Sequence, residues 1–319
     1  MKELKLGETA MRFECDQLGK VDDSHGDRVW PKITVVTPSF NQVDFLEESI
    51  RSVLLQEYPN LEYILLDGGS TDGSVEIIKK YSPRFSHWES HPDHGQSNAI
   101  NRGLKAGTGE IQCWINSDDY LALGALAMIA KTFSEDIETQ WIVGAATLLD
   151  HQGNQSIRSA RHLSPSELMR WTRCNWFCQQ ATFWRTSLIQ QTGFLNESLH
   201  YTMDWELWLR FYAVASPRII DQPLAFYRFH ENAKCVDQLD RYYFEEIRLL
   251  LSIVDAAEDS PLARYRNEAR GRLLELWTRA YQSEETQRSS LQHYGGFELM
   301  TEVVRRTFRW AAPNSSKPE

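Results

Sequence analysis

The amino-acid sequence predicts an α/β fold, in which a mostly parallel, Rossmann-like central sheet is flanked by helices and followed by a helical C-terminal extension. Short apolar runs rich in β-branched residues alternate with helix-like segments over the first ~135 residues. Each of these runs ends in polar residues, and after about residue 234 the pattern is helical. Because strand, crossover helix and strand imply parallel pairing, this alternation favours a parallel sheet in the first half.

The first four strands are expected where apolar runs are short and end abruptly. They lie at residues 33–37, 61–66, 85–89 and 111–115. Helices are expected from Asp44 to before Tyr58, and over residues 74–81, 96–105 and 121–133. Asp44 and Glu47 have the spacing of a capping box, which predicts that the first of these helices begins at Asp44.

The second half of the chain changes character. Strands are expected at residues 141–149, 180–185 and 219–229, with short helices after Ser164 and at residues 188–192 and 204–211. Ser164 and Glu167 form a second capping box with proline at the first helical position. Helices are expected at residues 242–255, 262–281 and 297–310, and their arginines at positions 264, 266, 270 and 272 are interpreted as a solvated face.

Composition excludes several classes of protein. The 319 residues carry a net charge of −10 and are 42% hydrophobic, which is typical of a globular protein and disfavours nucleic acid as a partner. No apolar run reaches the ~18–20 residues that a membrane span needs, and the N-terminus lacks the apolar core of a signal peptide. The five cysteines have no zinc-site spacing, so reduced thiols and a cytoplasmic location are expected.

Polar side chains follow several of the predicted strands where each strand ends. Thr37, Asp67, Glu89 and Asp118 occupy such positions. Because the carboxyl ends of parallel strands share one edge of the sheet, these side chains are expected around one crevice. Asp118 and the adjacent Asp119 repel one another, and a bound cation relieves that repulsion. A polar turn that caps the next helix is the alternative interpretation of these two acids.

Five motifs in order carry a resemblance to a known family. They are Thr37-Pro38-Ser39-Phe40-Asn41, Leu66-Asp67-Gly68-Gly69-Ser70-Thr71-Asp72, the block from His91 to Gly103, Asn116-Ser117-Asp118-Asp119, and Met203-Asp204-Trp205-Glu206-Leu207-Trp208-Leu209-Arg210. Together they resemble an inverting family 2 glycosyltransferase with a GT-A fold, of the type that builds bacterial surface polysaccharides. The resemblance covers roughly residues 32–232.

The resemblance implies a division of the chain into four parts. Residues 1–31 are an N-terminal arm, residues 32–135 the nucleotide-sugar-binding half, residues 136–234 the acceptor-binding half, and residues 235–319 a helical C-terminal extension. The implied reaction moves a sugar from a nucleotide-sugar donor, most readily a UDP-sugar, to a hydroxyl of a glycan or lipid-linked acceptor. A lipid-linked acceptor implies peripheral contact with the inner membrane face, and the C-terminal helices are candidates for homo-oligomer contacts.

The resemblance also assigns the donor site. The nucleotide-sugar-binding residues are Thr37, Pro38, Ser39, Phe40, Asp67, Gly68, Asp93, Gln96 and Asp118. A divalent cation, Mn²⁺ or Mg²⁺, is assigned to Asp118, Asp119 and His230, with Asp119 as the direct ligand. Turn formation is the alternative role for Asp67, loop hydrogen bonding and helix capping those for Asp93 and Gln96, and a satisfied, partly buried side chain that for His230.

The acceptor side is assigned to a second set of residues. Asp204 matches the general base, a carboxylate that takes the proton of the acceptor hydroxyl. Its alternative role is a helix N-cap. Trp176, Gln179 and Glu206 are candidate acceptor contacts, and Trp171 and Trp184 are further candidates for stacking on a sugar unless they belong to the core.

The chain departs from the family pattern at two positions of the donor site. Gly68 stands where many members have a second acid, and Asn116 or Ser117 stands at the first position of the acidic motif. The alternative function is a non-catalytic, nucleotide-binding relative that acts as a scaffold or partner protein. It predicts loss of the base or of the metal-binding acids, and both are present here. A nucleotidyltransferase is disfavoured because no glycine-rich, basic loop follows the first strand, and a processive synthase because the sequence has no predicted membrane span.

Overall fold

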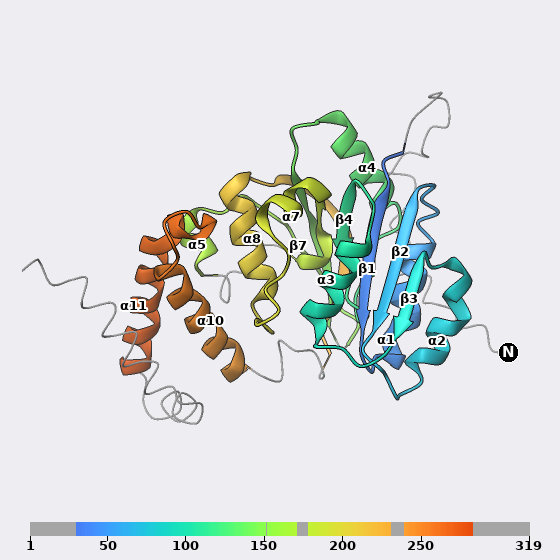
Figure 1. Ribbon diagram of the computed structural model, residues 1–319, viewed down its shortest axis with the longest axis horizontal. Coiled ribbons are helices and arrows are strands. Elements are labelled where there is room, and N and C mark those ends of the chain that lie inside the picture. Colours follow the sequence, from blue (N-terminus) through green and yellow to red (C-terminus); the bar gives the residue numbers. More distant parts are fainter. Residues whose placement is uncertain (1–29, 151, 171–177, 231–238, 283–319) are drawn as a thin grey trace, which may run out of the picture. The chain divides into compact units, whose positions relative to one another are not determined.

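Strand β1 (Ile33–Ser39) lies within a nine-stranded sheet in the computed structural model, which describes residues 30–150, 152–170, 178–230 and 239–282 (Figure 1). The strand order is β3-β2-β1-β4-β8-β6-β9-β5, and β7 pairs with β6. The remaining strands are β2 (Leu61–Asp67), β3 (His87–Ser90), β4 (Ile111–Trp114), β5 (Tyr120–Leu121), β6 (Trp141–Leu149), β7 (Gln155–Arg158), β8 (Thr182–Arg185) and β9 (Arg218–Arg228).

The sheet is mixed rather than uniformly parallel. Strands β1 to β4 pair in parallel, as the alternation of strands and helices predicts, and β6 pairs in parallel with β9. The other four pairings among the described strands are antiparallel and involve β5, β7 and β8. The α/β class with a sheet flanked by helices is thus confirmed, and the antiparallel pairings are confined to the second half of the sheet.

Helices cover the sheet on both sides. They are α1 (Val43–Leu54), α2 (Ser74–Tyr81), α3 (Gln96–Ala106), α4 (Ala125–Glu135) and α7 (Thr186–Thr192), with 3-10 turns η1 (Ser82–Arg84) and η2 (Gln179–Ala181). The order of the strands reverses between β1 and β4, so right-handed crossovers place α1 and α2 on one face and α3 on the other, as Figure 1 shows. Helix α3 packs closely on β1, because a Cβ atom at Gly103 would lie 2.5 Å from Val36.

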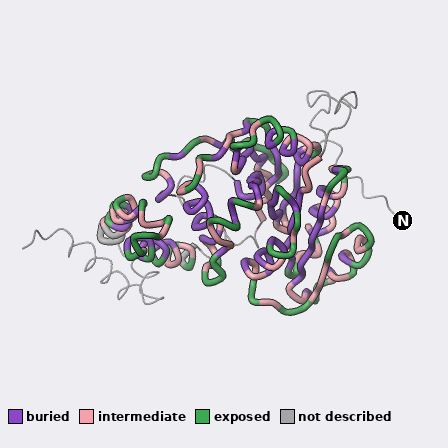
Figure 2. Tube along the Cα trace, turned by 45° about the horizontal axis from the view of Figure 1, so that its top comes forward, coloured by how far each residue is buried: buried purple, intermediate pink, exposed green. Residues whose placement is uncertain are grey.

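The core of the sheet consists of large apolar side chains from both halves. Trp114, Trp141 and Trp184 are fully buried, and the rings of Trp114 and Trp184 pack edge to face at 5.5 Å. Figure 2 shows this buried interior in purple along the strands. Trp184 is therefore a core residue, and the alternative that it stacks on an acceptor sugar is wrong. Cys113 and Cys178 are buried free thiols, and burial raises the pKa of Cys178 to about 11.

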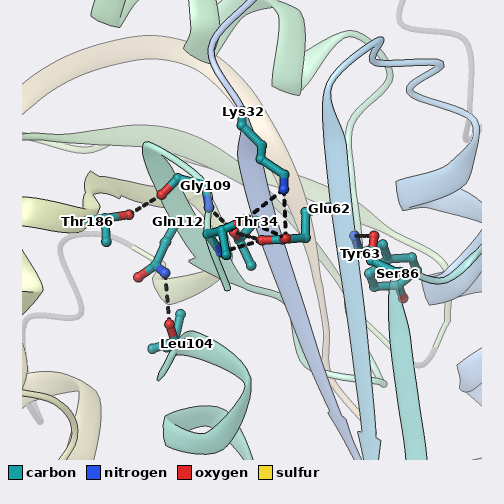
Figure 3. Close-up of polar contacts among 10 residues, drawn as sticks. Lys32, Thr34, Glu62, Tyr63, Ser86, Leu104, Gly109, Gln112 and Thr186 are labelled. Carbon is teal, nitrogen blue, oxygen red and sulfur yellow. Dashed lines mark hydrogen bonds and ion pairs between the residues drawn. The ribbon is translucent and has the colours of Figure 1, made fainter. Parts of the chain in front are cut away.

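Glu62 organises the amino-terminal ends of the strands, the ends opposite the polar loops. Its carboxylate accepts hydrogen bonds from the hydroxyls of Thr34 (2.6 Å) and Thr108 (2.8 Å) and pairs with Lys32 at 2.9 Å (Figure 3). Burial alone raises the pKa of a carboxyl, but these hydrogen bonds outweigh it and lower the pKa of Glu62 to about 2. The Glu62 carboxylate thus ties β1, β2 and the loop before β4 together.

Two of the helix starts that differ from the prediction have an identifiable local cause. Helix α1 begins after Gln42 rather than at Asp44, because the carboxylate of Asp72 in the neighbouring loop accepts from the Val43 amide at 2.9 Å. Helix α4 begins after Gly124 rather than at residue 121, because Tyr120 and Leu121 pair with β9 as strand β5. In contrast, β6 has the predicted bounds, and the capping box at Ser164 is confirmed.

A second compact unit is assembled from three separate stretches of sequence. It comprises residues 163–175, 198–214 and 231–319, whereas the sheet belongs to the unit of residues 1–162, 176–197 and 215–230. Its described elements are α5 (Pro165–Leu168), α8 (Met203–Val214), α10 (Leu239–Val254), the 3-10 turn η3 (Pro261–Tyr265) and α11 (Arg266–Gln282). The N-terminal arm over residues 1–29 and the helix expected at residues 297–310 lie outside the described residues.

The sequence predicted that the arginines at positions 264, 266, 270 and 272 form a solvated face, and two of them instead bind other helices of the second unit. Arg272 is 2% exposed and pairs with the fully buried Glu246 of α10 at 2.9 Å. Arg264, in η3, donates a hydrogen bond to the carbonyl of Ala213 at the end of α8. These two side chains hold the helices of the second unit together.

Candidate active site

The loops after β1 and β2 are interlocked at the carboxyl edge of the sheet. The Asn41 amide donates to the Ser70 hydroxyl at 2.7 Å, and the Thr71 amide donates to the Asn41 side-chain oxygen at 2.9 Å. Asn41 adopts a positive φ of 52°, which its short polar side chain tolerates. These contacts fix Phe40, which precedes Asn41 and is 60% exposed.

Asp67 holds the loop that follows it instead of pointing into open space. Its carboxylate is fully buried and accepts from the amides of Gly69 and Ser70 and from the hydroxyls of Ser70 and Ser90, at 2.5 to 3.1 Å. These bonds show the turn-forming role that the sequence offered for Asp67, and its contact with a nucleoside stays a prediction.

Gly68, the position at which many family members carry a second acid, separates an aromatic ring from a carboxylate. A Cβ atom built there would lie 3.3 Å from Phe40 Cδ2 and 3.3 Å from Asp93 Oδ2. The other oxygen of Asp93 accepts from the Gly95 amide at 2.7 Å, which fixes the carboxylate in its loop. Phe40 and Asp93 thus flank the same face of Gly68, with the ring exposed and Oδ2 turned toward it.

The other predicted residues of the first loop are buried beneath that surface. The Thr37 hydroxyl lies 3.1 Å from the Tyr63 hydroxyl, and Pro38 is buried in the strand. Ser39 is 5% exposed, and its hydroxyl has no hydrogen-bond partner in the described structure. Among Thr37 to Phe40, only Phe40 presents its side chain openly. That this stretch lines a nucleotide pocket stays a prediction.

Asp118 and His230 come together from distant parts of the sequence. The Nε2 atom of His230 lies 3.1 Å from Oδ2 of Asp118, and the imidazole packs against the Phe45 ring with centroids 4.5 Å apart. The Asp118 side chain is 24% exposed and that of His230 is 13% exposed. His230 Nδ1 is buried without a hydrogen-bond partner in the described structure. This pair therefore offers a carboxylate and an imidazole side by side, partly open to solvent.

Asp119 is buried, in contrast to its neighbour. It is 1% exposed, Oδ1 accepts from the Arg228 amide at 3.0 Å, and Oδ2 accepts from Gln180 Nε2 at 2.6 Å. Burial and the charge of Asp118 raise the pKa of Asp119 well above its usual range. The direct contact with a cation expected of Asp119 is thus better suited to Asp118, whose carboxylate is more exposed.

Arg228 locks the acidic loop in place and was missed by the sequence reasoning. Its Nε donates to the Asp118 carbonyl at 2.5 Å, and its NH1 pairs with Glu48 at 2.5 Å. The guanidinium lies between the rings of Phe45 and Tyr120, each centroid 5.0 Å away. The available signal was the alternation of a strand, which places Arg228 and His230 on the same side two residues apart.

Amides surround the acidic loop from two further elements. Gln96 Nε2 donates to the Asn116 side-chain oxygen at 2.9 Å, and Asn116 in turn donates to Gln179 Oε1 at 3.3 Å. Gln179 also donates to the Trp114 carbonyl at 2.7 Å and is 8% exposed. Gln179 therefore supports the acidic loop, which differs from its expected contact with an acceptor, and Asn116 occupies its motif position as a hydrogen-bonding link.

Asp204 and Glu206 lie at the start of α8, in the second unit. Asp204 is partly buried, and its Oδ1 accepts from the Trp205 amide at 2.7 Å. Trp205 is fully buried and donates to the Leu168 carbonyl, which anchors this end of the helix. Both oxygens of Glu206 pair with Arg210 at 2.7 and 2.9 Å and are buried, so an acceptor contact by Glu206 is not supported. Trp171 and Trp176 lie outside the described residues.

The order of the strands and the position of the acidic loop are typical of nucleotide-binding α/β proteins. A sheet that reverses its strand order at β1 and β4, with acids in the loop after β4, is the arrangement in which open α/β sheets bind nucleotides. Residues 34–186 match the family described as Glycosyl transferase family 2. This segment is 153 of the 319 residues, and over it the chain is similar to the family 2 glycosyltransferases, as the resemblance implied.

Relatives and solved structures agree with this assignment. A protein of Mycobacterium tuberculosis (strain ATCC 25618 / H37Rv), described as an uncharacterized glycosyltransferase, is 28% identical over 191 residues, which are 59% of this chain and 71% of the relative. S. aureus TarS 1-349 in complex with UDP-GlcNAc superposes with a TM-score of 0.62 at 17% identity, over 88% of this chain and 82% of that one. The mannosyltransferase PcManGT from Pyrobaculum calidifontis, in complex with GDP-Man and Mn2+, gives 0.51 at 17% identity, over 93% and 89%. At this identity the two structures establish the fold.

The described residues contain neither a ready-made metal cluster nor a helix suited to a bilayer. No group of three or more His, Cys, Asp or Glu side chains converges there in a way that could hold a metal ion. None of the described helices combines the length and apolar character that crossing a bilayer requires.

Proposed function

We propose that the chain transfers a sugar from a nucleotide-sugar donor to an acceptor hydroxyl with inversion of the anomeric centre. The observation that carries this proposal is the pairing of Asp118 with His230 beside a loop held by Arg228. The strand ends bring a carboxylate, an imidazole and a guanidinium to one edge of the sheet, which suits a diphosphate and its cation.

The nucleobase is proposed to bind on the face of Gly68. There the exposed Phe40 ring offers a surface for stacking, and Asp93 Oδ2 offers an acceptor for a ring N–H. In this proposal Asp93 supplies the carboxylate that many relatives carry at the Gly68 position itself. Uracil and guanine both present such an N–H group, which agrees with the UDP-sugar bound by TarS and the GDP-mannose bound by PcManGT. A UDP-sugar is the favoured donor.

Asp118 and His230 are proposed to hold a divalent cation, Mn²⁺ or Mg²⁺. These side chains suit a cation, because Asp118 Oδ2 and His230 Nε2 lie 3.1 Å apart. His230 Nδ1 has no hydrogen-bond partner among the described residues, so no contact forces the proton onto Nε2. Two protein ligands are enough where substrate phosphates and water complete the shell, as is common for Mg²⁺. When bound, the cation neutralises charge on the departing diphosphate.

Asp204 is proposed to be the general base that takes the proton of the acceptor hydroxyl. It lies at the start of α8, where the Trp205 contact with Leu168 anchors the helix. The acceptor oxygen forms its bond to the anomeric carbon as the bond to the diphosphate breaks, and the proton passes to the carboxylate of Asp204. One displacement of this kind inverts the anomeric centre, and the acceptor is proposed to be a glycan or a lipid-linked glycan.

A thermal-shift panel tests the donor site directly. The chain is heated with UDP-, GDP-, dTDP- and CMP-sugars, with and without Mn²⁺. One class of nucleotide is expected to raise the melting temperature in a Mn²⁺-dependent manner, because a ligand that binds the folded state stabilises it. Asp118→Asn is expected to abolish the Mn²⁺ dependence, whereas Glu76→Gln, an exposed carboxylate on α2, is expected to preserve it.

The chemistry is tested with the donor that the panel identifies. Asp204→Asn is expected to retain donor binding and to lose turnover by about 100-fold or more. Nuclear magnetic resonance of the product is expected to show the anomeric configuration opposite to that of the donor. If no nucleotide sugar stabilises the folded chain, a non-catalytic role takes the place of this proposal.

A further inference from the structure

The turn before α8 is bound by a carboxylate from another helix. Glu245 of α10 accepts four hydrogen bonds from three consecutive residues of this turn. The His200 amide donates to Oε2 at 2.8 Å, and the Tyr201 amide donates to Oε1 at 2.6 Å. The Thr202 amide and hydroxyl donate to Oε1 at 2.7 and 2.9 Å. Both carboxylate oxygens of Glu245 are thus directed at this single turn.

This turn determines where α8 begins. The Thr202 carbonyl accepts the first helical hydrogen bond, from the Glu206 amide at 3.0 Å, and Thr202 is fully buried. A threonine in this position usually accepts a bond from the helix with its own hydroxyl. Here the hydroxyl donates to Glu245, so α10 holds the residue from which the helix starts. Asp204 follows two residues after Thr202, within the first turn of the helix.

The same face of α10 reaches Asp204 by a second route. Tyr242 lies one turn before Glu245, and its ring centroid is 6.4 Å from that of Tyr201. Burial and the nearby carboxylate of Asp204 raise the pKa of the Tyr242 hydroxyl well above its usual range. At the other end of α8, Arg264 donates to the Ala213 carbonyl at 2.8 Å. The helix therefore has an anionic side chain at its N-terminus and a cationic one at its C-terminus, both from the C-terminal extension.

We propose that Glu245 is a positioning residue for Asp204, so that the C-terminal extension sets the geometry of the proposed general base. This inference rests on the proposed function of Asp204. The carboxylate of Glu245 fixes the backbone of residues 200–202, which fixes the first turn of α8 and the direction in which the Asp204 side chain leaves the helix. The extension is thereby a working part of the transferase rather than an appendage to it.

Charge and geometry both require a carboxylate at position 245. Four donors converge on two oxygens, and a glutamine offers only one oxygen and directs an N–H group at the donors that face the other. Glu245→Gln therefore keeps the three bonds at one oxygen and loses the fourth, together with the charge at the helix N-terminus. Glu245→Ala loses all four. The two variants are expected to form a graded series.

Hydrogen exchange in the full-length chain tests the structural half of the proposal. Amides of residues 200–206 are expected to exchange about tenfold faster in Glu245→Ala than in the wild type, with Glu245→Gln between the two. Amides of β1 and β2, in the other unit, are expected to exchange at unchanged rates. Unchanged protection of residues 200–206 in Glu245→Ala would overturn the proposal.

Kinetics test the functional half, with the donor selected by the thermal-shift panel and nucleotide release as the readout. Glu245→Ala is expected to lower kcat by about 10- to 100-fold, with KM for the donor within twofold, because a small displacement of a catalytic group costs rate rather than donor affinity. Glu245→Gln is expected to recover part of that loss. A merely structural residue would lower the folded fraction and leave kcat per folded molecule unchanged.

Two control variants separate positioning from stability and from charge. Glu246→Gln, the next residue of α10, weakens the buried pair with Arg272 and is expected to lower the melting temperature with unchanged kcat per folded molecule. Asp259→Asn removes an exposed charge from the same unit and is expected to change neither quantity.

The Asp204→Asn variant separates the proposal that Asp204 is the general base from the proposal that Glu245 positions it. If Asp204→Asn turns over at the wild-type rate, the proposed base is wrong. If it is inactive while both Glu245 variants retain wild-type kcat, the base stands and the positioning role of Glu245 is overturned.

Discussion

His230 Nε2 lies 3.1 Å from Asp118 Oδ2 although 112 residues separate them in the chain. The contact exists because β5, just after Asp118, pairs with β9, which ends two residues before His230. A strand pairing of two residues thus sets the spacing of the proposed cation ligands. The matched family segment, residues 34–186, contains only Asp118 of this pair.

Replacing His230 by alanine is expected to weaken Mn²⁺ binding in the presence of the donor by about tenfold, because the cation loses its only proposed nitrogen ligand. The melting temperature without ligands is expected to change little, since the imidazole is partly exposed. Calorimetric titration of Mn²⁺ into the donor complex measures the affinity. Equal affinities in the variant and the wild type would remove His230 from the site.

Arg228→Lys is expected to lower the free energy of unfolding by about 2 kcal/mol. A lysine cannot donate to the Asp118 carbonyl and pair with Glu48 at once, and it loses the flat contact with the rings of Phe45 and Tyr120. The negative charges of Asp119 and Glu48 are then less well balanced by a nearby cation. Urea unfolding followed by fluorescence measures the difference. Arg84→Lys, at an exposed position, is the matched control and is expected to stay within 0.5 kcal/mol, roughly the range of surface substitutions.

Gly68→Ala is expected to weaken nucleotide binding by about tenfold. The added methyl carbon would lie 3.3 Å from both the Phe40 ring and Asp93 Oδ2, and it would occupy the face on which the base is proposed to lie. Gly271→Ala in α11 is the matched control, because no atom lies within 4 Å of the new carbon. It is expected to stabilise the chain by about 0.5–1 kcal/mol and to leave nucleotide affinity unchanged. Equal nucleotide affinity in Gly68→Ala would move the base elsewhere.

Glu62→Gln is expected to remove a pH-dependent part of the stability. The pKa of Glu62 is about 2 in the folded chain and 4.5 for an unperturbed glutamate, so its ionised form stabilises the fold above pH 4.5. That stabilisation is lost as the pH falls from 4.5 toward 2, because the unfolded chain takes up the proton first. The wild type is expected to exceed the variant by about 2 kcal/mol at pH 7, and the difference is expected to shrink below pH 4.5. Urea unfolding at several pH values measures it, and a constant difference would contradict the pKa of Glu62.

The sequence predicted the strands well where the pattern within the strand itself defines them. The run from Trp141 to Leu149 became β6 with the same bounds, because its burial pattern is continuous and its ends are polar. The sequence failed at Tyr120 and Leu121, which continue an apolar helical pattern and form β5 only because β9 arrives from a hundred residues away. Pairing of this range leaves no local periodicity to read.

The candidate site was predicted in its residue types more than in their individual roles. Asp67 ends β2, and Asp118 and His230 follow β4 and β9, whereas the roles that the resemblance assigns to them stay predictions. Their roles depend on hydrogen bonds that the spacing of residues in the sequence does not predict. Asp67 accepts hydrogen bonds from the loop that follows it, and the buried Asp119 accepts one from Gln180. The clamp by Arg228 needs four segments to meet, and only the folded chain brings them together.

Glu245 also bears on the order in which the chain becomes competent during synthesis. Thr202, which precedes α8, is synthesised 43 residues before Glu245, whose carboxylate holds the turn at residues 200–202. Until α10 emerges, the amides of residues 200–202 have only water or transient partners, and the first turn of α8 is expected to fray. The sheet can be complete once β9 has been made, at residue 228, whereas the geometry around Asp204 is set only after residue 245 has been made. During this delay the unfinished chain has the residues of the proposed donor site but lacks a positioned general base.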